Sequence, residues 1–424
     1  MLKRKRDLAG AHHDLGRLYE WQGRFTEALA SYDAAIRLKF ARAWIHVNRA
    51  VVLLDLHRPA EAEAGCQTAI RAEPRLLLAH LFLGRALEIQ NKLPEALAAY
   101  EAALRSDPGS DPGHADPGSF PGYAEVQNDI GNVLLKQGKD AQAEEAFLTA
   151  IRLNPALLEP RRGLANCLLR QNRLPEAEAA AREAIHLRPG DTWAHFTLGN
   201  VLRRAGQPEK AIAAWREAIR LQPAFRGVAW QEAIRRQPAF RAAAGNLATL
   251  LADLGRFDEA LQVVRQCPDL GAEWIARAER WVALDRRLPQ VLGGKDKPTD
   301  AEQIEFARLC QRKKLYRAAA RFIEAAFAAQ PPLAEDLQSG NRYDGACMAA
   351  LAAGGFGGDA TRLDAAERAR LRGQALGWLR DDLGLWGKQL EAGGPQVRDD
   401  AKFPISSGFP QQNGTSFAPG FVAR

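Results

Sequence analysis

Sulfur is scarce in this chain of 424 residues, which contains two methionines and five cysteines. The cysteines lie far apart in the sequence, and no CxxC or Cys/His spacing indicates a zinc site. They fall in alanine-rich surroundings at positions 66, 167, 267, 310 and 347. We therefore predict buried, reduced thiols and no metal site.

Long apolar runs are also missing. No run of 18 apolar residues occurs, so we expect no membrane-spanning helix. The first residues, MLKRKRD, are charged and no apolar stretch follows, which excludes a secretory signal there. These absences predict a cytoplasmic protein.

A catalytic constellation is missing as well. The eight histidines are scattered, and His12 and His13 show no further ligand pattern. We therefore predict a non-catalytic protein without a cofactor. The net charge of +7 comes mainly from arginines interspersed with Asp and Glu, which is typical of solvated helix faces. It favours an acidic protein partner over nucleic acid, because the aromatics are not arranged to stack bases on a basic face.

A ladder of alanines is the strongest pattern present. Successive members are separated by 34, 34, 47, 34, 34 and 49 residues. The ladder consists of Ala28, Ala62, Ala96, Ala143, Ala177, Ala211 and Ala260. A second ladder of prolines follows the alanines at a constant offset: Pro74, Pro108, Pro155, Pro189 and Pro223. A period of 34 predicts helical hairpins stacked into a solenoid.

Two further positions recur with the ladder. An aromatic residue often follows the alanine by four positions: Tyr32, Tyr100, Phe147 and Trp215. A glycine precedes it within the first helix: Gly16, Gly84, Gly131 and Gly199. A mid-helix glycine costs about 1 kcal/mol relative to alanine, so we expect two helices to approach closely there. We expect the aromatic side chain to fill the space between hairpins.

These residue types at these offsets resemble the tetratricopeptide repeat family. The resemblance implies an all-α, right-handed superhelical solenoid of helical hairpins with a C-terminal helical extension. We assign seven repeats, at 9–42, 43–76, 77–110, 124–157, 158–191, 192–225 and 241–274. Residues 1–8 are expected to form a basic tail.

Two insertions interrupt the period, at 111–123 and 226–240. The first lies in a Gly/Pro/Asp/Ser-rich stretch and is either a docking loop over the groove or a tolerated surface insertion. The second follows from a local duplication, since WREAIRLQPAFR at 215–226 returns as WQEAIRRQPAFR at 230–241.

The period is lost after residue 274. We interpret 275–300 as a linker, 301–392 as a looser helical region, and 393–424 as a disordered tail. Ala318, Phe322 and Ala325 are taken as the ladder alanine, its aromatic and the following alanine. Residues 300–398, from ARLCQRKKLYRAAARF onward, resemble the C-terminal region of bacterial serine/threonine protein kinases that carry such repeats. The kinase motifs HRD, DFG and VAIK are absent.

The family resemblance implies that the first helix of each repeat lines a concave groove. Carried onto repeats 4–6, it assigns nine groove residues to a peptide site: Asn128, Asn132, Lys136, Arg162, Asn166, Arg170, Phe196, Asn200 and Arg204. Asparagine offers a donor and an acceptor to a peptide backbone, and Lys or Arg binds carboxylates. We therefore predict a scaffold that binds an extended, acidic peptide. The alternatives are a repeat pattern inherited without a ligand, and the regulatory portion of a kinase system.

Overall fold

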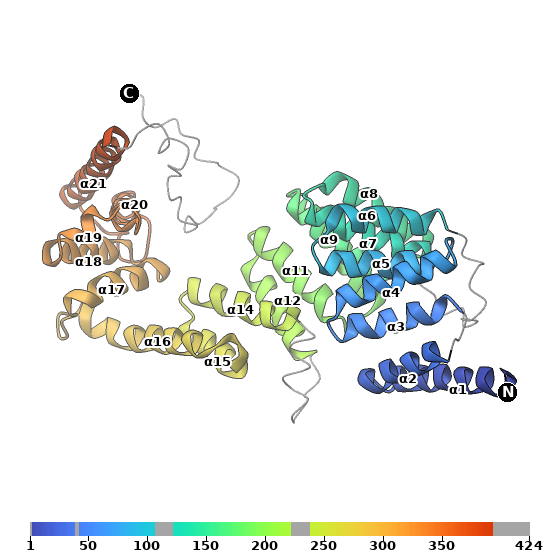
Figure 1. Ribbon diagram of the computed structural model, residues 1–424. Helices are drawn as coiled ribbons and strands as arrows, with labels where there is room; N and C mark the ends of the chain where they lie inside the picture. Colours follow the sequence, from blue (N-terminus) through green and yellow to red (C-terminus); the bar gives the residue numbers. More distant parts are fainter. Residues whose placement is uncertain (1, 39–41, 107–121, 222–237, 393–424) are drawn as a thin grey trace. The chain divides into compact units, whose positions relative to one another are not determined.

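The computed structural model describes residues 2–38, 42–106, 122–221 and 238–392, and its regular secondary structure there is helical throughout (Figure 1). The fold class is therefore the predicted all-α solenoid of hairpins. Most of both insertions and the whole 393–424 tail lie outside the described residues. The chain divides into two compact units, residues 1–221 and 222–424, which are described separately.

Unit 1 contains six helical hairpins within its described residues (Figure 1). The first helices of the hairpins are α1 (Leu2–Trp21), α3 (Trp44–Asp55), α5 (Leu77–Ile89), α7 (Tyr123–Lys136), α9 (Glu159–Arg170) and α11 (Thr192–Arg204). The second helices are α2 (Phe25–Arg37), α4 (Pro59–Ala72), α6 (Leu93–Leu104), α8 (Asp140–Leu153), α10 (Leu174–Leu187) and α12 (Pro208–Arg220). Because α1 begins at Leu2, residues 2–8 continue the first helix, and the interpretation of 1–8 as a tail is wrong.

A left-handed residue makes the turn inside each hairpin, five positions before the ladder alanine. Glycine occupies it in three hairpins of unit 1, at Gly23, Gly138 and Gly206, each with φ between 70° and 75°. Asn91 and Asn172 occupy it in two more, and His57 in the second hairpin, with φ of 58°. Glycine and asparagine adopt this conformation readily, whereas histidine is strained there.

The helical glycines lie against the aromatic rings. A Cβ added at Gly84 would lie 2.4 Å from the ring of Tyr100, and one at Gly199 would lie 2.3 Å from Trp215. Both rings are fully buried. Each aromatic thus packs on the glycine of its own hairpin, which refines the expectation that it fills the space between hairpins. Phe147 does both, because it also lies against Gly163 of the next hairpin.

The glycine–aromatic pair varies as a unit. Hairpin 2 has Ala50 at the glycine position and Cys66 at the aromatic position, and both are fully buried. Hairpin 5 has Ala165 and Ala181 at the same two positions, again fully buried. A large aromatic ring on the second helix therefore occurs where the first helix has glycine. Where the first helix has alanine, the second helix has a small residue, as close packing requires.

The first helices form the tighter layer of unit 1. From α3 to α11 each first helix contacts the next, while the second helices make their main inter-hairpin contact with the following first helix. A stack curves toward the layer whose members are closer together. We infer that the first helices line the concave side.

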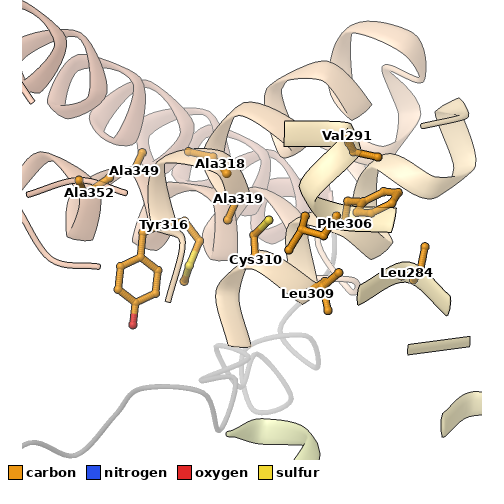
Figure 2. Packing of buried hydrophobic residues seen from close by; sticks show 14 of the residues in the cluster. Leu284, Val291, Phe306, Leu309, Cys310, Tyr316, Ala318, Ala319, Ala349 and Ala352 are labelled. Atoms are coloured by element: carbon orange, nitrogen blue, oxygen red, sulfur yellow. The ribbon is translucent and has the colours of Figure 1, made fainter. Parts of the chain in front are cut away.

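Unit 2 has its own core, to which α15, α16, α17, α18, α20 and α21 contribute buried residues (Figure 2). Phe306, Leu309 and Cys310 are fully buried there and belong to one cluster with Ala319 and Ala349, in which Cys310 lies next to Ala319. The helices are α14 (Pro238–Asp253), α15 (Phe257–Gln266), α16 (Ala272–Leu292), α17 (Asp300–Arg312), α18 (Tyr316–Ala329), α19 (Pro332–Glu335), α20 (Asn341–Ala353) and α21 (Ala365–Ala392), with a short 3-10 helix at Pro268–Leu270.

The linker interpretation of 275–300 is wrong for most of its length. Helix α16 continues to Leu292 and buries Val282, Leu288 and Val291. Trp281 on α16 stacks on Phe257 of α15 with ring centroids 5.7 Å apart. The 34-residue period is lost because one long helix replaces a hairpin, while its apolar face remains packed.

The ladder of unit 2 is displaced by one residue from the sequence interpretation. The left-handed turn residue is Lys314, with φ of 56°, and the alanine five positions later is Ala319. Ala319 and Ala326 are fully buried, as the ladder alanine and its follower are elsewhere. The correct set is therefore Ala319, Ile323 and Ala326, and the assignment to Ala318, Phe322 and Ala325 is wrong.

Candidate peptide-binding groove

The nine predicted site residues lie on three neighbouring first helices of unit 1. Residues 128, 132 and 136 belong to α7, residues 162, 166 and 170 to α9, and residues 196, 200 and 204 to α11. Since α7 contacts α9 and α9 contacts α11, the three helices form one continuous surface. Their side chains nevertheless have different environments, which decide what each can do.

Asn132 and Asn166 are accessible amides on this surface. Asn166 is exposed and Asn132 is half-buried, and neither side chain hydrogen-bonds to another described residue. Each carboxamide therefore has its donor and its acceptor available to a ligand backbone. Asn200, at the equivalent position of α11, is half-buried.

Asn128 is part of the wall beneath the surface, because it is only 8% exposed. Its amide nitrogen donates to the Asp129 carboxylate at 3.2 Å. Its Oδ1 atom is buried and accepts no hydrogen bond within the described parts of the chain. Asn128 thus differs from Asn132 and Asn166, although all three share a residue type and a face.

Three of the four predicted basic residues are already paired within the protein, and two of these pairs involve Lys136 and Arg170. The Lys136 ammonium lies 2.8 Å from Glu88 on α5. The Arg170 guanidinium lies 3.0 Å from Asp140 and donates to the Leu135 carbonyl at 3.1 Å. These charges join hairpins along the stack, and a ligand carboxylate would have to compete with the internal partner.

Arg162 is held at the start of α11. Its guanidinium lies 3.1 Å from the Asp191 carboxylate, which also accepts the Ala194 N–H at 2.7 Å as the N-cap of that helix. The ion pair therefore fixes α9 to the start of α11. Sequence spacing showed the arginine but not this partner.

Arg204 is the exception among the basic residues. Its side chain is exposed on the last turn of α11 and forms no ion pair with any other residue that the structure describes. Phe196, two turns earlier, is half-buried and lies edge-on to Trp193 at 5.9 Å. The α11 end of the surface thus offers an aromatic ring and a cation that no described residue pairs with.

A partly buried ion pair between α5 and α7 was not predicted from the sequence. Arg85 lies 2.8 Å from Asp129, and Lys136 pairs with Glu88 on the same two helices. Burial raises the pKa of Asp129, and the Arg85 guanidinium opposes that shift.

The hairpins on either side of the first insertion are connected by a hydrogen bond. Tyr123 donates to the Ser106 carbonyl at 2.7 Å. The stack therefore continues from the third hairpin to the fourth.

The described residues contain no candidate metal site, and burial disfavours the reactive thiolate form of their cysteines. No cluster of three or more His, Cys, Asp or Glu side chains there could hold a metal ion. None of the five cysteines, all of them in described residues, forms a disulfide bond, and burial raises the pKa of Cys66 and Cys310 to about 12. Among the described helices none is long and apolar enough to cross a membrane.

Comparison with known proteins identifies the repeats. Tetratricopeptide repeat models match residues 8–39, 47–111, 128–192, 193–225 and 229–271. A curated relative, the Hsp70-Hsp90 organizing protein of Triticum aestivum, is 34% identical over 96 residues, which are 21% of this chain and 15% of the relative. The chain thus spans a small part of the length of that protein.

Solved structures are similar to parts of the chain at low identity. The pilF protein of Pseudomonas aeruginosa is 20% identical, with 55% of this chain and 99% of that chain covered and a TM-score of 0.42. YrrB, described as a tetratricopeptide protein with an unusual peptide-binding site, is 21% identical, with 49% and 97% covered and a TM-score of 0.34. Matches to the repeat models extend over more than half of the residues, and the chain therefore belongs to the tetratricopeptide repeat family.

Proposed function

We propose that this protein is a non-catalytic scaffold that binds an extended peptide segment of a protein partner on the concave surface of α7, α9 and α11. The single observation that carries the proposal is the accessible amide pair, Asn132 and Asn166, on adjacent first helices. Such amides bind a peptide backbone without selecting its side chains.

The acidic preference of the ligand is proposed to come from one end of the surface. Lys136 and Arg170 are neutralised by Glu88 and Asp140, so they contribute little free charge. Arg204 is exposed and uncompensated by any described residue, and it can bind a carboxylate of the ligand in a bidentate manner. The acidic residue of the ligand is therefore expected at the α11 end. The five cysteines, none of them in a disulfide bond, suit a reducing compartment such as the cytoplasm.

Panning a random decapeptide library against the protein tests this proposal. Selected peptides should bind Asn166→Ala and Arg204→Glu variants at least about tenfold more weakly, the loss expected for one hydrogen-bonded or charged contact. The matched control is Lys210→Glu, an equal charge reversal at an exposed site on the second helix α12. Lys136→Glu is unsuitable because it would place two carboxylates together at Glu88.

Two outcomes of this experiment would contradict the proposal. Equal binding to wild type, Asn166→Ala and Arg204→Glu would exclude the α7–α11 surface. Loss of binding in Lys210→Glu alone would move the site to the second-helix layer.

A regulatory role in a serine/threonine kinase system is the second candidate. It is supported by the sequence resemblance of residues 300–398, which include helices α17 to α21. It predicts a kinase domain encoded in frame immediately upstream in the genome. An in-frame stop codon directly upstream would contradict it, and would leave the scaffold proposal unaffected.

A further inference from the structure

Helix α1 exposes an apolar stripe along its outer face. Leu8 is 51% exposed, Leu15 38% and Leu18 48%, and Ala11 between them is also exposed. The four residues are spaced by three, four and three positions, so they share one side of the helix. We refer to Leu8, Ala11, Leu15 and Leu18 as the α1 stripe.

Two positions of the stripe are buried in every later hairpin of unit 1. The residues equivalent to Leu18 are all fully buried: Val52, Ala86, Val133, Cys167 and Val201. The residues equivalent to Ala11 are buried too: Ile45, Ala79, Val126, Pro160 and Ala194. In those hairpins the preceding second helix covers the face, since α2 contacts α3, α4 contacts α5, and so on to α11. The α1 stripe is therefore an inter-hairpin packing surface without its neighbour among the described residues.

Exposed apolar packing surfaces lead to association between molecules. Here the outer face keeps the apolar residues of an internal interface. Helix α1 has 20 residues, against 12 to 14 in the later first helices, so the helix offers extra length for a contact.

The stripe is self-complementary under a two-fold axis. Its three–four–three spacing is the same in both directions, so two antiparallel α1 helices centred at residue 13 place Leu8 level with Leu18 and Ala11 level with Leu15. At the centre a small residue then opposes a large one, as interdigitated packing requires. A two-fold interface uses the same patch on both subunits, and a palindromic patch satisfies that condition.

We propose that a second copy of this chain covers the α1 stripe, forming an antiparallel α1–α1 homodimer that leaves the concave surface of α7–α11 free. The chain has a mass of 46.5 kDa, so the assembly has twice that mass. The proposal is independent of the peptide-binding function.

Sedimentation velocity on the full chain, between about 1 and 100 μM, tests this proposal. We expect a dimer for wild type and a dissociation constant raised more than about a hundredfold by Leu15→Lys/Leu18→Lys, since two buried leucines per subunit become charged. The control is Leu153→Lys/Leu187→Lys, at leucines that are 54% and 42% exposed on second helices, and it should remain dimeric. Far-UV circular dichroism of each variant verifies that the helices remain folded.

A monomer throughout this range in wild type would overturn the proposal, as would unchanged dimerisation of the α1 variant. Cysteine crosslinking under mild oxidation tests whether the two α1 helices run antiparallel. Ala11→Cys/Leu15→Cys should form an intermolecular disulfide that neither single variant forms, because only unlike positions are level. A crosslink in Ala11→Cys alone would overturn the antiparallel arrangement.

Discussion

At the scale of single residues, packing in this protein depends on pairs of matched size. Gly84 and Tyr100 occupy one hairpin, whereas Ala50 and Cys66 occupy the same positions in another. The sequence showed the glycine and aromatic ladders separately, at a spacing that does not reveal contact. Only the structure shows that each glycine admits the ring of its own second helix.

Gly84→Ala should destabilise unit 1 by about 1–3 kcal/mol, because its methyl group would overlap the buried Tyr100 ring, which is also fixed by a hydrogen bond to Glu88 at 2.9 Å. Chemical denaturation followed by circular dichroism measures the change. Gly373→Ala on α21 is the control, because nothing lies within 4 Å of the added carbon. That control should be neutral or stabilising by up to about 1 kcal/mol.

His57→Gly should stabilise the second hairpin by about 1 kcal/mol. His57 is exposed and left-handed, so the substitution removes backbone strain without removing a buried contact. The reverse effect is expected for Gly138→Ala, which introduces a similar strain at φ of 75°. Thermal unfolding of the two variants should shift in opposite directions, and a shared direction would contradict this account.

At the scale of helices and their junctions, ion pairs join elements that the repeat pattern treats as independent. Glu302 at the start of α17 accepts from Arg287 on α16 at 2.6 Å and from the Thr299 N–H at 3.0 Å. Arg287, followed by the Thr299 N–H, lowers the pKa of Glu302 to about 2. The carboxylate thus fastens α17 to α16 and caps α17 at once.

Glu302→Gln should reduce stability by about 2 kcal/mol at pH 7, since the ionised form is favoured by folding. The folded pKa lies below the unfolded value, so this contribution is present above about pH 4.5 and is lost as the pH falls toward 2. Denaturation curves of wild type and variant should therefore converge as the pH is lowered from 7 to 3. Glu305→Gln, a more exposed partner of Arg280, should show a smaller difference at every pH.

At this scale the sequence predicts the elements that repeat and misses those that do not. The hairpins of unit 1 repeat every 34 residues, so their fold class could be read directly. Helix α16 could not, because it packs through a single face without repeating. In unit 2 the turn residue is Lys314, which carries no glycine signal, and the ladder was consequently placed one residue early at Ala318.

The candidate groove shows the same limit. Position in the repeat indicated that Asn128, Lys136 and Arg204 share a face, but not which of them is accessible and uncompensated. That property depends on partners from other hairpins, such as Glu88, which lies 48 positions from Lys136. The site itself stays a prediction until a ligand is bound.

At the scale of the whole molecule, the two units have separate cores. In a solenoid each hairpin is stabilised by its neighbours, so damage spreads within a unit before it affects another. Ala177 in unit 1 and Ala319 in unit 2 hold equivalent, fully buried positions. They provide a matched pair with which to test the independence of the units.

Differential scanning calorimetry should resolve two transitions that respond separately to substitution. Ala177→Leu overpacks the contact of α10 and should lower only one of them, by an amount corresponding to about 1–3 kcal/mol. Ala319→Leu should lower only the other, for the same reason on α18. A single transition lowered equally by both variants would show that the units unfold together.

The matched glycine and aromatic positions also bear on how such a gene can be rearranged. A crossover between whole repeats keeps the first-helix glycine and the second-helix aromatic residue together. A crossover within a hairpin can instead place an aromatic residue opposite an alanine, whose methyl group occupies the space that the ring needs. The duplicated phrase at 230–241 copied Trp215 as Trp230 without copying Gly199. Recombination of single helices therefore produces unpaired halves, and the hairpin is the smallest unit of inheritance that preserves the packing. Phe147, which lies against glycines of two hairpins, marks a junction where even an exchange of whole repeats would separate matched residues.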